Sequence, residues 1–344
     1  MAVVQVTLQD IADRAGVHRS TVALALRDHP RLPEHTRRKL QALAKKLGYR
    51  QNPLVAALMR SRRQGNAVKH VTLAFVTSYP TRYGWRPQFH DRPDFFPGAV
   101  RRAADFGYKL EHFWRGEPGM SSARFDEILR ARGINGIIIG RLPPGQYTLE
   151  LPWEHFSCVA LGMTLRSPLL HHVTENHFDT AWQAMQRCRE RGYRRVGFVF
   201  SEANDSPRVG DRWYGAYLAQ QACFPAKDRL PICPGMPADQ ATFTNWFRRE
   251  RPDALLVNHS GPVFTWLRAT GQAVPSDVGI VELEDHPELG SAGVYYDPAK
   301  IGALAVEMLV GLMHRNETGV PDDQHEIVLN GEWRDGTTLP RRDH

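Results

Sequence analysis

Residues 7–27 of the chain read TLQDIADRAGVHRSTVALALR, a pattern typical of two short helices joined by a tight turn at Gly16. Thr7 and Asp10 have the spacing of an N-cap pair, which predicts that the first helix begins near Leu8. Apolar residues recur where two crossed helices would bury them together: Ile11, Ala12, Ala15, Val17, Val22 and Leu26. The stretch is therefore predicted to form a helix-turn-helix, a unit whose second helix can enter the major groove of DNA.

The excess positive charge of the chain lies beside this stretch. Residues 1–63 hold 13 Lys and Arg against 4 Asp and Glu, a balance of +9. The whole chain has 44 basic and 37 acidic residues, or +7, so residues 64–344 hold 31 basic and 33 acidic residues, or −2. A module that binds phosphates concentrates charge in this way, whereas a solvated basic tail would lack the apolar periodicity. We therefore expect the amino-terminal part to bind DNA.

The composition excludes several other classes of protein. With 344 residues and a hydrophobic fraction of 42%, the chain can form a small head and one large or two medium domains. No apolar run approaches the roughly 18 residues of a membrane span, and the first residues lack the pattern of a signal peptide. The four cysteines form no Cys-x-x-Cys pair, which favours free thiols in a reducing compartment. The expected location is the cytoplasm, without a membrane partner.

A third helix is predicted after the first two. Pro33 suits its first turn, Lys45 and Lys46 favour its carboxyl end, and Gly48 can terminate it. Three leucines would pack it onto the preceding pair: Leu40, Leu43 and Leu47. Residues 49–63 then hold about two turns of a further helix, which are marginally stable alone in water.

Beyond residue 70 the pattern changes to alternating strands and helices. The predicted strands are Val71–Thr77, Tyr108–Trp114, Gly136–Gly140, Cys158–Gly162, Arg195–Phe200, Ala254–Val257, Val278–Glu282 and Glu326–Leu329. The predicted helices are Phe95–Phe106, Ser122–Arg132, His177–Arg191, Arg212–Ala222, Gln240–Arg249, Val263–Thr270 and Pro298–His314. This alternation predicts an α/β fold with parallel sheets covered on both faces. The series restarts near residue 170, so two similar lobes are expected.

Motifs at fixed spacings carry a resemblance over nearly the whole chain. They include Thr7-Leu8, Asp10-Ile11-Ala12, Ala15-Gly16-Val17, Thr21-Val22, Thr36-Arg37, Leu47-Gly48-Tyr49, Asn52, Gly136-Ile137-Ile138 and Gly192-Tyr193. With them, the sequence resembles the lac repressor (LacI/GalR) family of bacterial transcription regulators. The resemblance implies a helix-turn-helix head on a two-lobed body like that of periplasmic binding proteins. It also implies a homodimer that binds operator DNA, with a tetramer as the alternative.

The resemblance also implies a division of the chain. The helix-turn-helix domain is expected at residues 1–50, and a hinge helix with a linker at residues 51–68. The first effector-binding lobe is expected to combine residues 69–167 and 297–325. The second lobe is expected to combine residues 168–296 and 326–344.

The family reads bases with three positions of the second helix, which here hold Arg19, Ser20 and Leu24. Arginine can pair with a guanine edge, whereas Leu24 can only touch a thymine methyl group or pack on sugar. Leu58 matches the leucine that family members wedge into the minor groove, with a linker helix docked on the body as the alternative. The expected DNA contacts are Thr7, Leu8, His18, Arg19, Ser20, Thr21, Leu24, Arg27, Arg31, Thr36, Tyr49, Asn52, Leu54 and Leu58.

Matching to the family also places an effector site between the lobes. Its expected residues are Tyr79, Arg212, Asn258, Glu284 and Tyr296. Arginine donates, glutamate accepts and asparagine does both, which suits the neighbouring hydroxyls of a sugar. The two tyrosines can form aromatic walls of the site, with ordinary core packing as the alternative.

A polar cluster near the predicted lobe boundary could suggest metal binding. It contains His171, His172, Glu175 and His177, which lack the i, i+4 spacing of helical ligands. No metal and no cofactor are therefore predicted.

Two competing functions are less well supported than a ligand-controlled repressor. A solute-binding protein for sugar uptake would need a signal peptide and no basic head. A sugar-metabolising enzyme would need catalytic motifs, and the sequence has no Gly-rich phosphate loop, nucleophile elbow or His-Glu-x-x-His. The chain is predicted not to be an enzyme.

Overall fold

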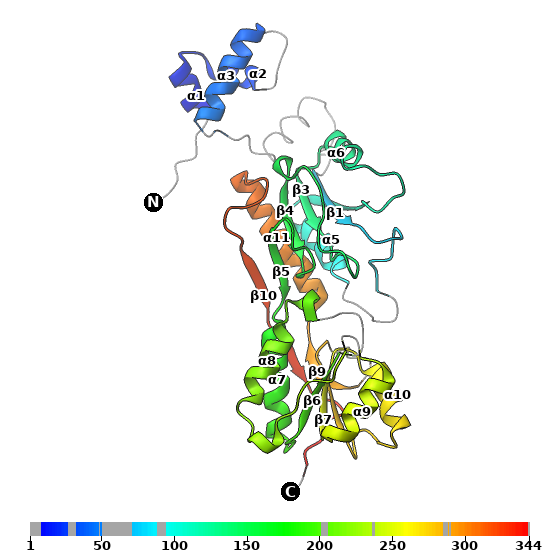
Figure 1. Cartoon of the computed structure of the whole chain (residues 1–344). Coiled ribbons are helices and arrows are strands. Elements are labelled where there is room, and N and C mark those ends of the chain that lie inside the picture. Colours follow the sequence, from blue (N-terminus) through cyan, green and yellow to red (C-terminus); the bar gives the residue numbers. More distant parts are fainter. Residues whose placement is uncertain are drawn as a thin grey trace. The chain divides into compact units, whose positions relative to one another are not determined.

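The computed structural model describes residues 8–26, 32–47, 49, 71–87, 94–200, 206–235, 238–284, 288 and 290–342. The chain divides into two compact units (Figure 1). One comprises Met1–Lys69 with Met313–Glu317, and the other comprises His70–Leu312 with Thr318–His344. We call residues 8–49 the head and the second unit the body. Among the described residues, no helix combines the length and apolarity needed to cross a bilayer.

The head contains three helices, as predicted. Their bounds are Leu8–Ala15 (α1), Arg19–Ala25 (α2) and Glu34–Lys46 (α3). Gly16 between α1 and α2 has φ +66°, in the left-handed region that favours glycine. The amide of Gln41 on α3 donates to the carbonyl oxygen of Ala25 at 2.9 Å, which caps the end of α2. The buried core of the head consists of Ile11, Ala12, Val22, Ala25, Leu40 and Ala44.

The first lobe of the body is built on a sheet of six parallel strands. They are Val71–Thr77 (β1), Tyr108–Trp114 (β2), Gly136–Ile139 (β3), Ser157–Leu161 (β4), His171–Glu175 (β5) and Glu326–Leu329 (β10). Their order is β10-β5-β4-β3-β1-β2. Because all strands run the same way, the residues that follow them gather at one edge of the sheet.

Helices cover both faces of this sheet. They are Phe96–Asp105 (α5), Ser122–Ala131 (α6) and Pro298–Arg315 (α11). Ala74 and Val76 of β1 belong to a buried cluster with Phe125 of α6. Phe75 of the same strand points to the opposite face, where its ring meets Phe96 of α5 edge to face at 5.1 Å.

Helices α5 and α11 approach each other through glycines. A Cβ atom on Gly302 of α11 would lie 2.0 Å from the carbonyl oxygen of Phe95, beside α5. A Cβ atom on Gly98 of α5 would lie 2.0 Å from the carbonyl oxygen of Ala299 on α11. The two backbones can therefore pack this closely only because neither position carries a side chain.

The second lobe is built on a sheet of five strands. They are Val196–Val199 (β6), Ala254–Val257 (β7), Gly279–Glu282 (β8), Ala292–Tyr295 (β9) and Glu332–Arg334 (β11), in the order β11-β9-β8-β7-β6. Only β11 among these described strands is antiparallel to its neighbour. The helices are His177–Glu190 (α7), Arg212–Gln221 (α8), Gln240–Glu250 (α9) and Ser260–Ala269 (α10). Leu256 packs with α7 and α8, and Leu255 with α9 and α10, so both faces are covered. Short 3-10 turns occupy Trp153–His155, Ser206–Val209 and Ala226–Asp228.

The pairing of strands corrects the predicted division of the body. Residues 168–175 were expected in the second lobe, but β5 pairs with β4 of the first sheet. Residues 326–344 were expected there too, but β10 pairs with β5, and only β11 of this stretch pairs within the second sheet. Strand β5 was missed because its sequence, HHVTE, lacks the continuous apolar run of a buried strand. Strands β9 and β11 were also missed.

The chain crosses between the lobes three times. It passes from β5 to α7, from β9 to α11, and from β10 to β11. Asn176 lies at the first crossing, and its side-chain amide donates to Oδ1 of Asn330 at the third crossing, at 2.8 Å. The hydroxyl of Tyr296, at the second crossing, donates to the carbonyl oxygen of Asn176 at 2.9 Å. Asn176 thus ties all three crossings together, at the carboxyl ends of β5, β9 and β10.

Candidate functional site

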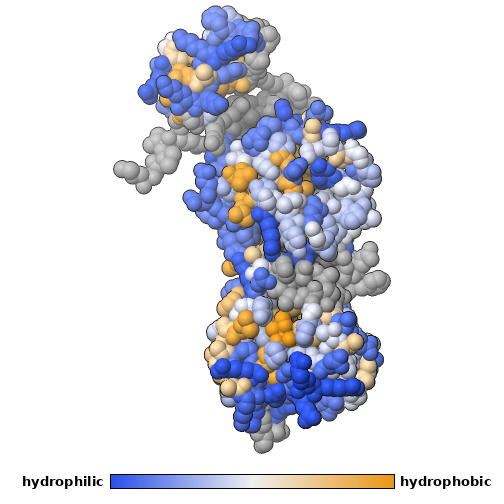
Figure 2. All heavy atoms as spheres, in the orientation of Figure 1, coloured by the Kyte–Doolittle hydropathy of each residue, from blue (hydrophilic) through white to orange (hydrophobic). Residues whose placement is uncertain are grey.

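The second helix of the head presents a polar face to solvent. Arg19 and Ser20 at its start are exposed, Leu24 is half-buried, and Val22 and Ala25 face the core. Exposed basic side chains elsewhere on the head are Arg14, Arg38, Lys39, Lys45 and Lys46. Figure 2 shows a largely hydrophilic surface on the visible face of the head. This arrangement can bring cations to phosphates and the start of α2 to base edges.

His18 supplies the cap of this helix. Its backbone is extended, with φ −73° and ψ 146°, and its ring Nδ1 accepts a hydrogen bond from the backbone N–H of Ser20 at 3.3 Å. The same ring nitrogen lies 2.8 Å from the hydroxyl oxygen of Ser20. A histidine therefore serves where a serine or threonine is the usual cap.

The other predicted DNA contacts divide into two groups. Leu8 and Tyr49 pack partly against the core of the head, and Thr21 and Thr36 are half-buried at its surface. The remaining ones lie outside the described residues: Thr7, Arg27, Arg31, Asn52, Leu54 and Leu58. Gly48, expected to end α3, also lies outside them. All of these contacts stay predictions.

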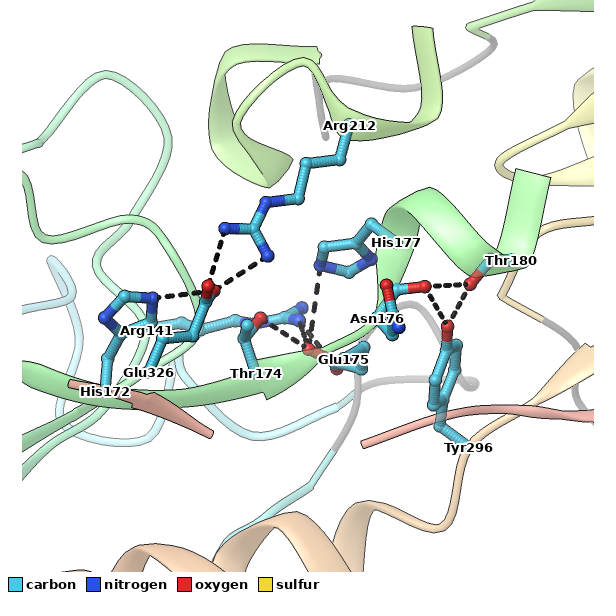
Figure 3. A network of polar contacts seen from close by, with 10 residues as sticks. All are labelled: Arg141, His172, Thr174, Glu175, Asn176, His177, Thr180, Arg212, Tyr296 and Glu326. Carbon is cyan, nitrogen blue, oxygen red and sulfur yellow. Dashed lines mark hydrogen bonds and ion pairs between the residues drawn. The ribbon is translucent and has the colours of Figure 1, made fainter. Parts of the chain in front are cut away.

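In the body, a buried carboxylate lies at the carboxyl end of β5. Nη2 of Arg141, which follows β3, donates to both oxygens of Glu175 at 2.7 and 2.8 Å. The hydroxyl of Thr174 donates to the same carboxylate at 3.2 Å, and Nε2 of His177 lies 3.7 Å from it (Figure 3). Glu175 is 3% exposed, so water cannot replace these partners.

Burial and charge set the protonation of this group. Burial alone would raise the pKa of Glu175, but the positive charge of Arg141, the neighbouring His177 and hydrogen bonds together outweigh it and the pKa is lowered. Burial lowers the pKa of His177 to about 4, since Arg141 and Arg212 offset the attraction of Glu175. The network at neutral pH is therefore an Arg–Glu ion pair beside a neutral imidazole. Nδ1 of His177 is buried and has no hydrogen-bond partner among the described residues.

A second ion pair joins the two lobes. Nη1 of Arg212, at the start of α8, lies 2.7 Å from Oε1 of Glu326 on β10, and Nη2 donates to Oε2 at 3.0 Å. Nε2 of His172 on β5 lies 3.0 Å from Oε1 of the same carboxylate. Figure 3 shows both side chains converging on Glu326. Arg212, an expected effector contact, is thus engaged by a carboxylate of the first lobe.

Tyr296 lies where the chain crosses between the lobes. Besides Asn176, its hydroxyl contacts the hydroxyl of Thr180, which also donates to the carbonyl oxygen of Asn176 at 3.0 Å. Burial raises the pKa of Tyr296 above that of a free phenol, so the hydroxyl keeps its proton. Its side chain therefore stabilises the crossing between the lobes.

The other expected effector residues also follow strands. Tyr79 follows β1 and is buried, Asn258 follows β7 and is buried, and Glu284 follows β8 and is half-buried. Burial lowers the pKa of Arg141, but interactions with Glu175, Glu284 and Tyr79 together outweigh it and the pKa is raised. Two nearby tryptophans, Trp85 and Trp213, pack into the cores of the lobes.

The polar cluster weighed as a metal site has other partners. Nδ1 of His171 accepts from the backbone N–H of His325 at 2.9 Å, and His172 contacts Glu326. Within the described part of the chain, no group of histidine, cysteine and carboxylate side chains has an arrangement able to hold a metal ion.

Several residues of the network were missed from the sequence. Arg141 lies two residues after the buried strand GIII, at the edge of the sheet where residues that follow parallel strands gather. That position is the signal by which it could have been found. Glu326 gave no such signal, because it begins a strand and enters the site only through the pairing of β10 with β5.

Two protein families and a relative from Bacillus subtilis match the chain. The chain matches the family described as "Bacterial regulatory proteins, lacI family" over residues 7–52, and the "Periplasmic binding protein-like domain" over residues 185–338. It is 45% identical over 340 residues to the "Probable HTH-type transcriptional repressor ExuR" of Bacillus subtilis (strain 168), covering 91% of this chain and 93% of that protein.

Two solved structures share the fold. The lac repressor dimer bound to operator and the anti-inducer ONPF has a TM-score of 0.56 and 15% identity, over 98% of this chain and 100% of that one. The transcriptional regulator CelR in complex with cellobiose has a TM-score of 0.53 and 18% identity, over 97% of this chain and 100% of that one. The identity to the Bacillus subtilis relative, over nearly all of both chains, decides the assignment. The chain belongs to the lacI family of bacterial regulatory proteins, which are DNA-binding transcriptional regulators and not enzymes.

Proposed function

We propose that this regulator is a repressor whose binding to operator DNA is controlled by a sugar held between the two lobes. The observation that carries the proposal is the gathering of donors and acceptors at the carboxyl ends of both sheets. Arg212, Asn258 and Glu284 come from the second lobe, and Tyr79 follows a strand of the first. Such a set suits neighbouring hydroxyls, because guanidinium groups donate to them and carboxylates accept from them.

The proposed active form is a homodimer that binds a two-fold symmetric operator. The lac repressor of known structure is a dimer on its operator, and CelR is a complex with cellobiose. These relatives support a similar assembly and ligand class for this chain. In each proposed subunit, Arg19 and Ser20 read bases while the other cations of the head attract phosphates.

A screen of the purified protein tests the ligand class. The melting temperature is measured with a panel of neutral monosaccharides, disaccharides and acidic sugars, and retention of genomic DNA fragments is measured with each sugar that raises it. We expect at least one sugar to stabilise the body and to change the affinity for a retained fragment, since the two affinities are reciprocally linked. Stabilisation by no sugar in the panel would contradict the proposed ligand class.

Substitution of the expected contacts tests the site. Arg212→Ala or Glu284→Ala should abolish the response of DNA binding to the sugar, and Glu284→Ala should retain the affinity for DNA without sugar. Glu332→Gln, at an exposed carboxylate of β11, serves as the control. An undiminished response would remove both residues from the site.

A further inference from the structure

Glu326 forms an ion pair with the guanidinium of Arg212, the group that the proposed function assigns to effector binding. The pair is bidentate, at 2.7 and 3.0 Å, and its members belong to different lobes. Arg212 is 26% exposed and Glu326 is 29% exposed, so a ligand can reach both. An arginine held by two parallel hydrogen bonds cannot direct the same two N–H groups at a hydroxyl. A ligand that takes these two N–H groups must therefore displace the carboxylate.

The carboxylate is held in place for this contact by its own lobe. Nε2 of His172 lies 3.0 Å from Glu326, and the other ring nitrogen of His172 lies 3.1 Å from the side-chain amide of Gln324. Burial would raise the pKa of Glu326, but Arg212 and His172 outweigh it and the pKa is lowered. The side chain is therefore an anion at neutral pH, aimed at Arg212.

The residues just before Arg212 also contact the first lobe. Nη2 of Arg208 donates to the carbonyl oxygen of Leu142 at 3.0 Å. A Cβ atom on Gly210 would lie 2.7 Å from the methyl carbon of Met163, so the backbone there approaches the first lobe closely. Residues 208–212 thus form one docking segment of the second lobe, and Arg212 is its ionic contact.

We propose that the Arg212–Glu326 pair is a latch between the lobes, closed without effector and opened when a sugar takes the guanidinium from the carboxylate. The proposal rests on the assignment of Arg212 to the effector site. It adds that Glu326 sets the lobe arrangement in the absence of ligand. Loss of the latch then biases the body towards the liganded arrangement, because a ligand acts by shifting a lobe equilibrium that already exists.

Distance measurements between spin labels test the latch without DNA or sugar. Labels are attached to cysteines at Glu150 in the first lobe and Arg248 in the second, both exposed, after Cys223→Ser removes the exposed native thiol. Glu326→Gln should shift the distance distribution of the full chain to longer separations. Arg212→Gln should give the same shift, and the double variant no larger one, because both substitutions break one contact. Glu332→Gln is the matched control and should leave the distribution unchanged.

Addition of sugar then separates this proposal from the preceding one. A stabilising sugar should move the wild-type distribution towards that of Glu326→Gln, and should move the variant less. An unchanged distribution in Glu326→Gln overturns the latch, whatever sugars bind. A shift in the variant combined with no effect of any sugar on the wild type supports the latch and counts against the sugar effector.

Discussion

At the scale of single residues, Arg19 has the exposure that base reading requires. Arg19→Ala should weaken binding by about 1–3 kcal/mol at one base pair and relax the preference there, because the bidentate contact to guanine is lost. Competition binding over single-base operator variants at fixed salt measures this. Arg14→Ala, at an exposed cation on α1, is the control and should weaken all sequences alike. An equal loss over all sequences for Arg19→Ala would assign it to phosphates.

His177 makes the stability of the body depend on pH. Its pKa is about 4 in the folded chain, below the 6.5 of an exposed histidine, because burial disfavours the charged form. The unfolded chain therefore takes up a proton first, and the free energy of unfolding falls as pH drops from 6.5 towards 4. The loss is as much as about 1.4 kcal/mol per pH unit from this side chain. His112, whose pKa burial, Arg82 and Arg86 also lower to about 4, adds to the same trend.

Urea unfolding at pH 7 and pH 5 checks the contribution of His177. His177→Gln should lose less stability than the wild type between these pH values, because glutamine does not titrate. Equal losses in both proteins would show that the imidazole has the same pKa in the folded and unfolded chains.

At the scale of elements, the crossing of α5 and α11 depends on two missing side chains. Gly302→Ala should destabilise the body by about 1–3 kcal/mol, because the added methyl group meets the backbone of Phe95 and forces the helices apart. Gly215→Ala on α8 is the matched control, since a Cβ atom there meets nothing within 4 Å. That variant should be as stable as the wild type, or its free energy of unfolding should rise by up to about 1 kcal/mol because alanine has a higher helix propensity than glycine. Thermal unfolding of the two variants side by side compares them.

The elements also show how far the sequence predicts the structure. Strands β1, β2, β7 and β10 were predicted with their observed bounds. The polar strand β5 was missed, and β5 and β10 were assigned to the wrong lobe. The sequence of a strand indicates whether that strand is buried, but not which strand it pairs with. The pairing and register in a parallel sheet depend on residues far along the chain. Glu326 was missed for this reason, whereas Arg212 was found by matching to the family.

At the scale of the whole molecule, the excess positive charge lies in the amino-terminal part of the chain and not in the part proposed to bind the sugar. The +9 balance lies in residues 1–63, and the remainder of the chain carries −2. Raising salt from 50 to 200 mM should weaken binding to DNA by about 10³–10⁵-fold if six to ten phosphates are contacted. The affinity for a neutral sugar should change little, because no counterions are released from it. Titrations of both ligands over this range measure the two slopes, and parallel slopes would contradict a separation of the two sites.

The three crossings between the lobes have a consequence for damaged versions of the gene. The edge strand β10 of the first sheet follows most of the second lobe in the chain, after strands β6 to β9. A nonsense mutation just before codon 326 would therefore remove part of the lobe that is translated first. Neither lobe is a contiguous stretch that recombination could exchange as a cassette. An exchange of regulatory specificity with a relative would have to swap the body entire, or alter side chains one at a time where the three strands cross.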